Sequence, residues 1–425
     1  MSAYDLAVGI DVKSANEAAA AVYAKLYPQL FKGSTHVAKD GLEFDVLWDV
    51  TAAPSVDFVP PPEAEEIVRD HLAAFEVPPG VTAEQLVAGY LQTLEDTVFQ
   101  LKMDQVTMTI KGDGDEGTDQ ITITIYVAVE SVGGALDLRP LKATGTTQNE
   151  ADEWFLNHAI LPEAMTLAAE ALRGIQLPKL TFSGVSLTPP AIKITPRHAV
   201  ALANLDGSPT PTPPFPDDWP ASSFFALLSD RAMLRVAQVA TRDIAGKRFG
   251  HSGSVDIGIG TAKYEATAVV DALDIGMAGG TDFAFKGRIR GNVNAGIKIG
   301  CTTFGVNYTL YAAPEPTGTI ALSIERTTVR ATTKRPLNTF VLLIRPDGNP
   351  IEWILSALTT PLLQVVAAVF SPLITKLFEG IAFNVWDIPS IPIDFRDVHL
   401  ALTPTDVHFT SFGGQTAIEG TARIG

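Results

Sequence analysis

The chain has 425 residues, and at about 150 residues per domain this length predicts two or three domains. Hydrophobic residues make up 46% and charged residues 19%, so the chain can build a packed core and is not a disordered polar chain. The net charge of −17 excludes a general nucleic-acid-binding protein, because phosphate backbones, like anionic lipid surfaces, would be repelled by the chain overall.

Targeting signals and cysteines indicate the compartment. The first ten residues have no basic cluster followed by an apolar run, so we expect no signal peptide and a cytoplasmic location. The single cysteine, Cys301, permits no internal disulfide and no multi-thiolate metal site, which fits a reducing compartment.

The first half of the chain opens with an expected helix. Ser14 is a capping residue, and the alanine-rich residues 15–30 place their larger apolar side chains on one helical face. Alternating strands and two short helices are expected next, with the last two strands paired across an acidic loop. In chain order these elements are residues 42–50, 63–75, 83–94, 105–110 and 120–129.

A long helix is expected to close the first half. It begins with Glu-Trp-Phe-Leu at residues 153–156 and passes Pro162. One apolar stripe at helical spacing consists of Leu161, Met165, Ala168, Leu172 and Ile175. Residues 206–220, DGSPTPTPPFPDDWP, then hold six prolines and predict a stiff, extended linker.

The second half repeats this order. A helix is expected at residues 224–243, capped by Ser222 or Ser223, and a strand-rich run follows at residues 254–330. A closing helix begins with Glu-Trp-Ile-Leu at residues 352–355 and passes a proline at the same offset as in the first half. Its apolar stripe is Leu355, Leu358, Leu362, Val366, Val369, Leu373 and Leu377.

The closing helix of the second half is uncharged from Trp353 to Thr375, which is long enough to span a membrane. Pro361, Pro372 and the absence of a basic flank argue against spanning. We therefore expect a helix buried on nearly all sides within a protein, or one that lies along something apolar.

The recurring order predicts an α+β fold of two tandem modules. Glu, Trp, an apolar residue, Leu and Pro occur at identical offsets in the two closing helices, which is economically explained by two copies of one unit. The expected domains are a first module at residues 1–205, the proline-rich linker at 206–220 and a second module at 221–425.

The same order resembles the tubular lipid-binding (TULIP) superfamily, which includes the bactericidal/permeability-increasing protein. The resemblance rests on a helix, antiparallel strands and a long apolar helix that lead through LPKL at residues 177–180 into GVSL and IKIT, with IPSI at 388–391 as the second copy. The opening Tyr4-Asp5, with Asn16 after it and no disulfide, looks most like the clostridial neurotoxin-cluster accessory proteins.

The resemblance implies a boomerang-like particle in which each module wraps a highly curved antiparallel sheet around its long apolar helix. It also implies a hydrophobic seam along each helix that holds lipid or another long apolar ligand. The residues expected to line these seams are Leu161, Met165, Leu172, Leu355, Leu358, Leu362, Val366, Val369 and Leu373. From spacing alone, the alternative is that both stripes simply pack against the sheet.

No constellation in the sequence predicts an enzyme or a cofactor. The acidic loop with Asp113, Asp115, Glu116 and Asp119 lacks the ligand spacing of a calcium-binding loop, and we expect a solvated hairpin tip. The histidines form no HExxH pair, so no metal site is expected. The chain also lacks a serine elbow and a phosphate-binding glycine loop at a strand-to-helix step.

A local reversal of charge occurs in the second half. The basic residues are Arg326, Arg330, Lys334, Arg335 and Arg345. Such a run is typical of a solvated face, and the alternative is contact with an acidic headgroup or partner.

These observations indicate a non-enzymatic protein that binds, and as a further step transfers, a lipid or fatty acyl ligand. A protein partner and transient membrane contact are compatible with this interpretation, and nucleic acid is not. The alternative from a different class is an assembly scaffold of the toxin-complex accessory type, in which side chains fill the seams.

Overall fold

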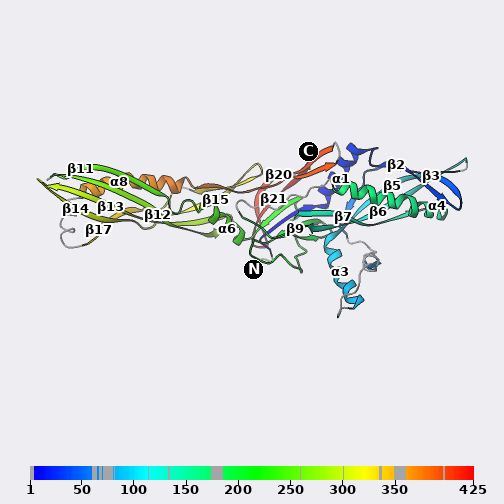
Figure 1. The fold of residues 1–425 in the computed structure, drawn as a ribbon, viewed down its shortest axis with the longest axis horizontal. Coiled ribbons are helices and arrows are strands. Elements are labelled where there is room, and N and C mark those ends of the chain that lie inside the picture. The colour runs from blue at the N-terminus through cyan, green and yellow to red at the C-terminus, as the bar shows by residue number, and fades with distance from the viewer. Residues whose placement is uncertain are drawn as a thin grey trace. The chain divides into compact units, whose positions relative to one another are not determined.

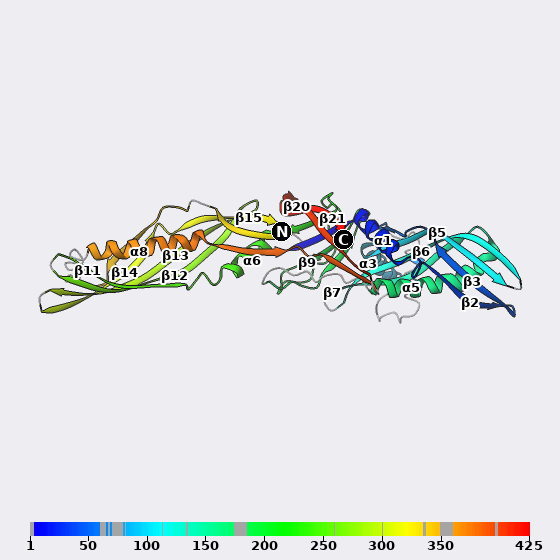
Figure 2. The ribbon, with the colours of Figure 1, turned by 90° about the horizontal axis from the view of Figure 1, so that it is seen from above.

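The computed structural model describes residues 4–59, 65–66, 69, 80, 82–112, 114–132, 135–173, 185–258, 260–299, 301–334, 337–348, 360–395 and 398–425. Curled antiparallel sheets make up most of the fold, with few helices (Figures 1 and 2). The chain forms two compact units. Unit 1 comprises residues 1–181, 186–229 and 388–425, and unit 2 comprises residues 182–185 and 230–387.

Unit 1 contains two sheets. The six-stranded sheet has the order β2-β3-β5-β6-β7, with β4 also paired to β5. Its strands are β2 (Lys32–Lys39), β3 (Leu42–Val50), β4 (Ser55–Asp57), β5 (Val98–Gly112), β6 (Asp115–Val132) and β7 (Ala135–Thr147). The expected strand at residues 42–50 is confirmed, and so is the pairing of 105–110 with 120–129, because Val106 lies opposite Ile121.

The seven-stranded sheet of unit 1 has the order β19-β20-β21-β10-β1-β9-β8. Its strands are β1 (Leu6–Asp11), β8 (Ala191–Ile194), β9 (His198–Ala203), β10 (Phe224–Leu228), β19 (Ile391–Phe395), β20 (Val398–Phe412) and β21 (Gln415–Ile424). The sheet therefore joins the beginning, the middle and the end of the chain.

The helix expected at residues 224–243 is a strand followed by a shorter helix. Phe224–Leu228 forms β10, which pairs with β1 and β21, and only Asp230–Thr241 is helical (α6). All five residues of β10 are buried. An apolar run that is buried on both faces has no alternation, so its sequence does not distinguish a strand from a helix.

The first expected helix is shifted toward the N-terminus. Helix α1 spans Val12–Leu26 because the carboxylate of Asp11 accepts a hydrogen bond from the backbone N–H of Ser14 at 2.8 Å. The helix ends before Pro28, which disfavours helical backbone at Tyr27. The helix expected at residues 83–94 is α3 (Ala83–Thr97), and most of the one expected at 63–75 lies outside the described residues.

The closing helical segment of unit 1 has three parts. These are α4 (Glu150–Phe155), a π-helical turn η1 (Leu156–Ile160) and α5 (Leu161–Arg173). Pro162 follows the π-helical turn, where the missing proline N–H is tolerated because the hydrogen-bonding pattern is already shifted. Leu156 lies over Gly145 of β7, where a Cβ atom would come within 2.8 Å of the Thr122 carbonyl oxygen.

Residues 206–220 belong entirely to unit 1 and are not merely a solvated spacer. Phe215 and Trp219 are buried, and the Trp219 ring stacks on Phe225 of β10 with a centroid distance of 5.8 Å. This apolar packing holds the proline-rich segment against one face of the seven-stranded sheet. The compact units therefore do not divide at this segment, and the repeat boundaries at 1–205 and 221–425 stay a prediction.

Unit 2 is one eight-stranded sheet with two described helices, α6 and α8 (Thr360–Glu379). The order is β11-β12-β13-β15-β16-β18, and β14 pairs with both β13 and β17. The strands are β11 (Arg248–Asp256), β12 (Thr261–Gly279), β13 (Asp282–Ile299), β14 (Thr302–Ala313), β15 (Thr317–Glu325), β16 (Thr328–Lys334), β17 (Val341–Pro346) and β18 (Ala382–Asp387).

Helix α8 lies along the sheet of unit 2 and contacts both β11 and β17 (Figures 1 and 2). The sequence led us to expect a helix that is buried on nearly all sides or that lies along something apolar. The described turns of α8 are instead buried along one stripe only. That stripe is Leu362, Val366, Phe370, Ile374 and Phe378, and each of these residues is fully buried. The sequence is apolar all round, so it could not show which side the sheet covers.

Candidate functional site

Clusters of polar side chains are the first candidates for a functional site. Among the described residues, no group of three or more His, Cys, Asp or Glu side chains is arranged to hold a metal ion. In the acidic loop, Asp113 lies outside the described residues. Asp115, Glu116 and Asp119 lie on β6, and the exposed Glu116 forms an ion pair with Lys111 at 3.2 Å.

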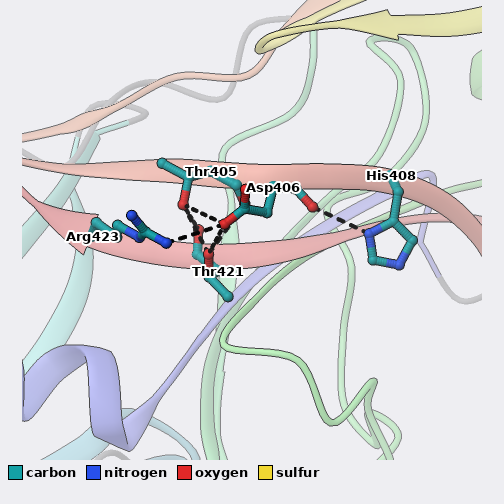
Figure 3. Close-up of polar contacts among 5 residues, drawn as sticks. All are labelled: Thr405, Asp406, His408, Thr421 and Arg423. Carbon is teal, nitrogen blue, oxygen red and sulfur yellow. Dashed lines mark hydrogen bonds and ion pairs between the residues drawn. The ribbon is translucent and has the colours of Figure 1, made fainter.

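A cluster of polar side chains lies on β20 and β21 (Figure 3). A β-bulge between Thr405 and His408 places Asp406 in the left-handed region, at φ 54°. The Asp406 carboxylate accepts hydrogen bonds from Thr421 at 3.2 Å and from Arg423 at 3.3 Å. The Asp406 and Arg423 side chains are 69% and 71% exposed, so this pair contributes little to stability and does not enclose a ligand.

The opposite face of the same two strands borders an apolar cavity inside unit 1. Leu402 and Pro404 of β20 and Ala422 of β21 line it, whereas Thr405 and Arg423 point to the other side by strand alternation. The cavity has a volume of about 370 Å³. This volume lies within the range of known small-molecule sites.

Every described residue that lines the cavity is apolar. The wall consists of Val8, Ile10, Ala15, Ala18, Ala19, Val22, Leu30, Phe31, Trp48, Val50, Pro54, Val56, Phe58, Phe99, Leu101, Met103, Ile123, Ile125, Val129, Leu138, Ile160, Ala164, Leu167, Ala168, Ala171, Leu172, Ile192, Ala199, Val200, Ala201, Phe224, Pro389, Leu402, Pro404 and Ala422. A cavity with such a wall provides few partners for water, so it favours an apolar occupant.

Two helices of unit 1 supply six of the nine alanines among the described wall residues. Helix α1 contributes Ala15, Ala18 and Ala19, and α5 contributes Ala164, Ala168 and Ala171. Alanine satisfies the apolar periodicity of a helix but does not reach across to the sheet. The alanine faces of α1 and α5 therefore leave volume that larger side chains would fill.

A charged residue next to the cavity wall, Lys193, forms its ion pairs outside the cavity. Lys193 follows the wall residue Ile192 on β8 and hydrogen-bonds to Asp96 at 2.7 Å and forms an ion pair with Asp217 at 2.9 Å. Burial lowers the pKa of Lys193, but the two carboxylates outweigh burial, and the pKa is raised overall. Lys193 therefore keeps its charge, and strand alternation directs it away from the cavity.

The structure brings one of the nine expected lining residues to the cavity. Leu172 is part of the wall. Leu161 and Met165 are half-buried and pack against the core of unit 1. The second helix lies in unit 2, where Leu362 and Val366 are fully buried, Val369 is half-buried and Leu373 is 42% exposed. Leu355 and Leu358 lie outside the described residues. A lipid-binding role for these nine side chains stays a prediction.

Sequence reasoning missed most of the wall. The alanines of α1 carried a usable signal, because six alanines within 15 residues of an amphipathic helix leave little bulk on its inner face. The strand residues carried no such signal, because Val8, Phe99 and Leu402 look like ordinary core residues and meet only in the folded unit.

Comparisons with known proteins gave structural neighbours only. No family profile matches the sequence, and no curated protein matches it. P47 of Clostridium botulinum E1 is similar with a TM-score of 0.45 and 10% identity, covering 99% of this chain and 100% of that one. P47 from Clostridium botulinum A2 has a TM-score of 0.45 and 10% identity, covering 99% and 97%.

A lipopolysaccharide binding protein is also similar, with a TM-score of 0.33 and 11% identity, covering 99% of each chain. The TULIP resemblance seen in the sequence stays a prediction.

Proposed function

We propose that the chain is a non-enzymatic protein that binds a lipid or another long apolar ligand in the cavity of unit 1. The single observation that carries this proposal is the 370 Å³ cavity, whose described wall residues are all apolar. An acyl chain that leaves water for such a cavity gains about 0.8 kcal/mol per buried methylene.

The wall also restricts how a ligand is recognised. Its described residues include no charged side chain and no hydroxyl or amide side chain, so they do not pair with a polar headgroup. Selection inside the cavity would rest on the length and shape of the apolar portion, and a headgroup would stay in water. Transfer of the ligand between membranes is a further step of the same proposal.

Extraction of the purified full chain with organic solvent, followed by mass spectrometry, tests this proposal. We expect a co-purifying lipid in the extract, and we expect the stripped protein to bind a fluorescent fatty acid. An empty extract together with no binding of fatty acid or phospholipid probes would overturn the proposal and favour the scaffold alternative.

A further inference from the structure

Helix α8 of unit 2 is largely apolar on the side that the sheet does not cover, where its exposed polar residues are Thr360, Gln364 and Lys376. Of the described helices, it is the one long and apolar enough to cross a membrane, judged by length and composition, but only 28% of its most apolar window is buried. Val365 is 37% and Leu373 is 42% exposed, and the exposed Pro361, Ala368 and Pro372 lie on the same side. Residues 361–375 contain no charged side chain.

Helix α6, the other described helix of unit 2, has a charged face toward water and an apolar face toward the core. Helix α6 buries Met233 and Val236 and exposes Asp230, Arg231 and Arg235. Such segregation is typical of a helix with one face in water. The exposed side of α8 departs from this pattern, and an exposed apolar surface of this kind marks a contact site.

The neighbouring strand extends the apolar surface. Strand β17 contacts α8, and its Val341 and Leu343 are 58% and 37% exposed. We name the exposed apolar residues of the two elements the α8–β17 patch. It consists of Val341, Leu343, Pro361, Val365, Ala368, Pro372 and Leu373.

Charge is divided unequally between the two units. Unit 2 has 16 Lys and Arg against 13 Asp and Glu, a net charge of +3, whereas unit 1 has 15 against 35, a net charge of −20. The elements of the patch carry Arg345 on β17 and, near the end of α8, Lys376 and the half-buried Glu379, so basic residues exceed acidic ones by one. An anionic surface would therefore attract unit 2 and repel unit 1.

The composition of the patch favours a lipid surface over a protein partner. Its members are aliphatic or proline, without the Tyr, Trp and Arg anchors that dominate protein interfaces. Basic residues that flank an apolar helical face are the combination that binds anionic bilayers.

The packing of α8 determines how it would meet the bilayer. Phe370, Ile374 and Phe378 are fully buried against the sheet, and Phe378 stacks on Phe285 of β13 at 5.6 Å. Spanning the membrane would remove these side chains from their contacts. We propose that the α8–β17 patch docks unit 2 onto an anionic lipid bilayer, with α8 lying along the surface and its buried stripe still on the sheet.

Vesicle flotation with the full chain tests this proposal. The probes are phosphatidylcholine vesicles with and without phosphatidylserine. We expect wild-type protein to float with the phosphatidylserine vesicles and less with the neutral ones, and we expect added salt to release it. The Val365→Glu/Leu373→Glu double variant should lose about tenfold in binding, because both side chains would carry charge into the bilayer interface.

Unit 1 offers a matched control. Leu42 and Val59 are 48% and 46% exposed, so a Leu42→Glu/Val59→Glu variant makes the same change of charge outside the patch. The control should float like wild-type protein or only slightly less, and both double variants should keep the wild-type melting temperature because all four sites are exposed. Fatty-acid binding in the unit 1 cavity should be unchanged in both, which separates this proposal from the proposed function.

Three results would overturn the proposal. The first is wild-type protein that does not float with either vesicle, and the second is equal binding by wild-type protein and the α8 variant. The third is a wild-type dimer that the α8 variant converts to a monomer without any vesicle binding, which would assign the patch to a second copy of the chain.

Discussion

The helices that line the cavity of unit 1 and helix α8 of unit 2 have similar apolar patterns but different inner faces. Helix α5 turns three alanines, Ala164, Ala168 and Ala171, toward a cavity, together with Leu167 and Leu172. Helix α8 turns Phe370 and Phe378, with the other large residues of its buried stripe, into contact with the sheet. The size of the inward side chains, rather than the apolar periodicity, thus decides whether a helix leaves room for a ligand.

Truncation of a large buried side chain gives the largest expected contrast between the two units. Phe370→Ala should lower the free energy of unfolding by about 3–5 kcal/mol, because it opens a void in a filled interface. Phe99→Ala in the cavity wall should cost less than about 3 kcal/mol, because Phe99 is half-buried and already borders free volume. Denaturant midpoints check both values, and equal losses would contradict the comparison.

Enlargement of a small residue tests the same difference from the other direction. Ala168→Trp should fill cavity space, so the variant should stay folded while its affinity for a fluorescent fatty acid falls about tenfold or more. Val366→Trp should instead cost about 1–3 kcal/mol of stability through overpacking, with fatty-acid binding retained. The two units would not differ as described if both variants lost stability and neither lost binding.

A lower pH should destabilise unit 1 through His198, by less than the substitutions above. Burial lowers the pKa of His198, a residue of β9 that is 3% exposed. Below about pH 6.5 the unfolded histidine binds a proton while the folded one stays neutral, so the contribution of His198 to the free energy of unfolding of unit 1 should fall as pH drops through this range and stay constant above it.

Hydrogen exchange measured separately in β9 and in β12 checks this pH dependence. The lone histidine of unit 2, His251, is exposed, so β12 should respond less than β9. His198→Phe should weaken the response of β9, and an unchanged response in that variant would show that another group causes it.

Calcium should have the smallest effect. The described carboxylates of the acidic loop are spread along β6, with Glu116 paired to Lys111, so millimolar calcium should leave the melting temperature unchanged. An increase that disappears in Asp115→Ala would mean that the acidic unit holds an ion as well as an apolar ligand.

The elements that could be predicted from the sequence are those in which polar and apolar residues repeat at a regular spacing. Strand β3 was predictable at residues 42–50, and the β5–β6 pairing was predictable, because polar and apolar residues alternate there. Strand β10 was not, because FFALL is buried on both faces and has no period. The division into units was also unpredictable, since β20 and β21 at the end of the chain complete a sheet that begins with β1.

The place of the cavity was not predictable from the sequence. The family resemblance implied an apolar seam along each closing helix, which stays a prediction, and of the residues expected to line the seams Leu172 lies on the cavity wall. The remaining wall depends on contacts between residues as distant as Ile10 and Ala422, and no local pattern encodes such contacts. The exposed side of α8 was likewise hidden, because a helix that is apolar all round does not show which face the sheet will cover.

Tryptophan quenching by a bromine-labelled fatty acid tests the central claim most directly. Trp48 lines the unit 1 cavity, whereas Trp386 is buried in β18 of unit 2. Two variants of the full chain would each keep one of these residues and replace the other four tryptophans by phenylalanine. A ligand in the cavity should quench Trp48 and leave Trp386 unchanged, and quenching of Trp386 alone, or of neither residue, would contradict the assignment of the apolar ligand to unit 1.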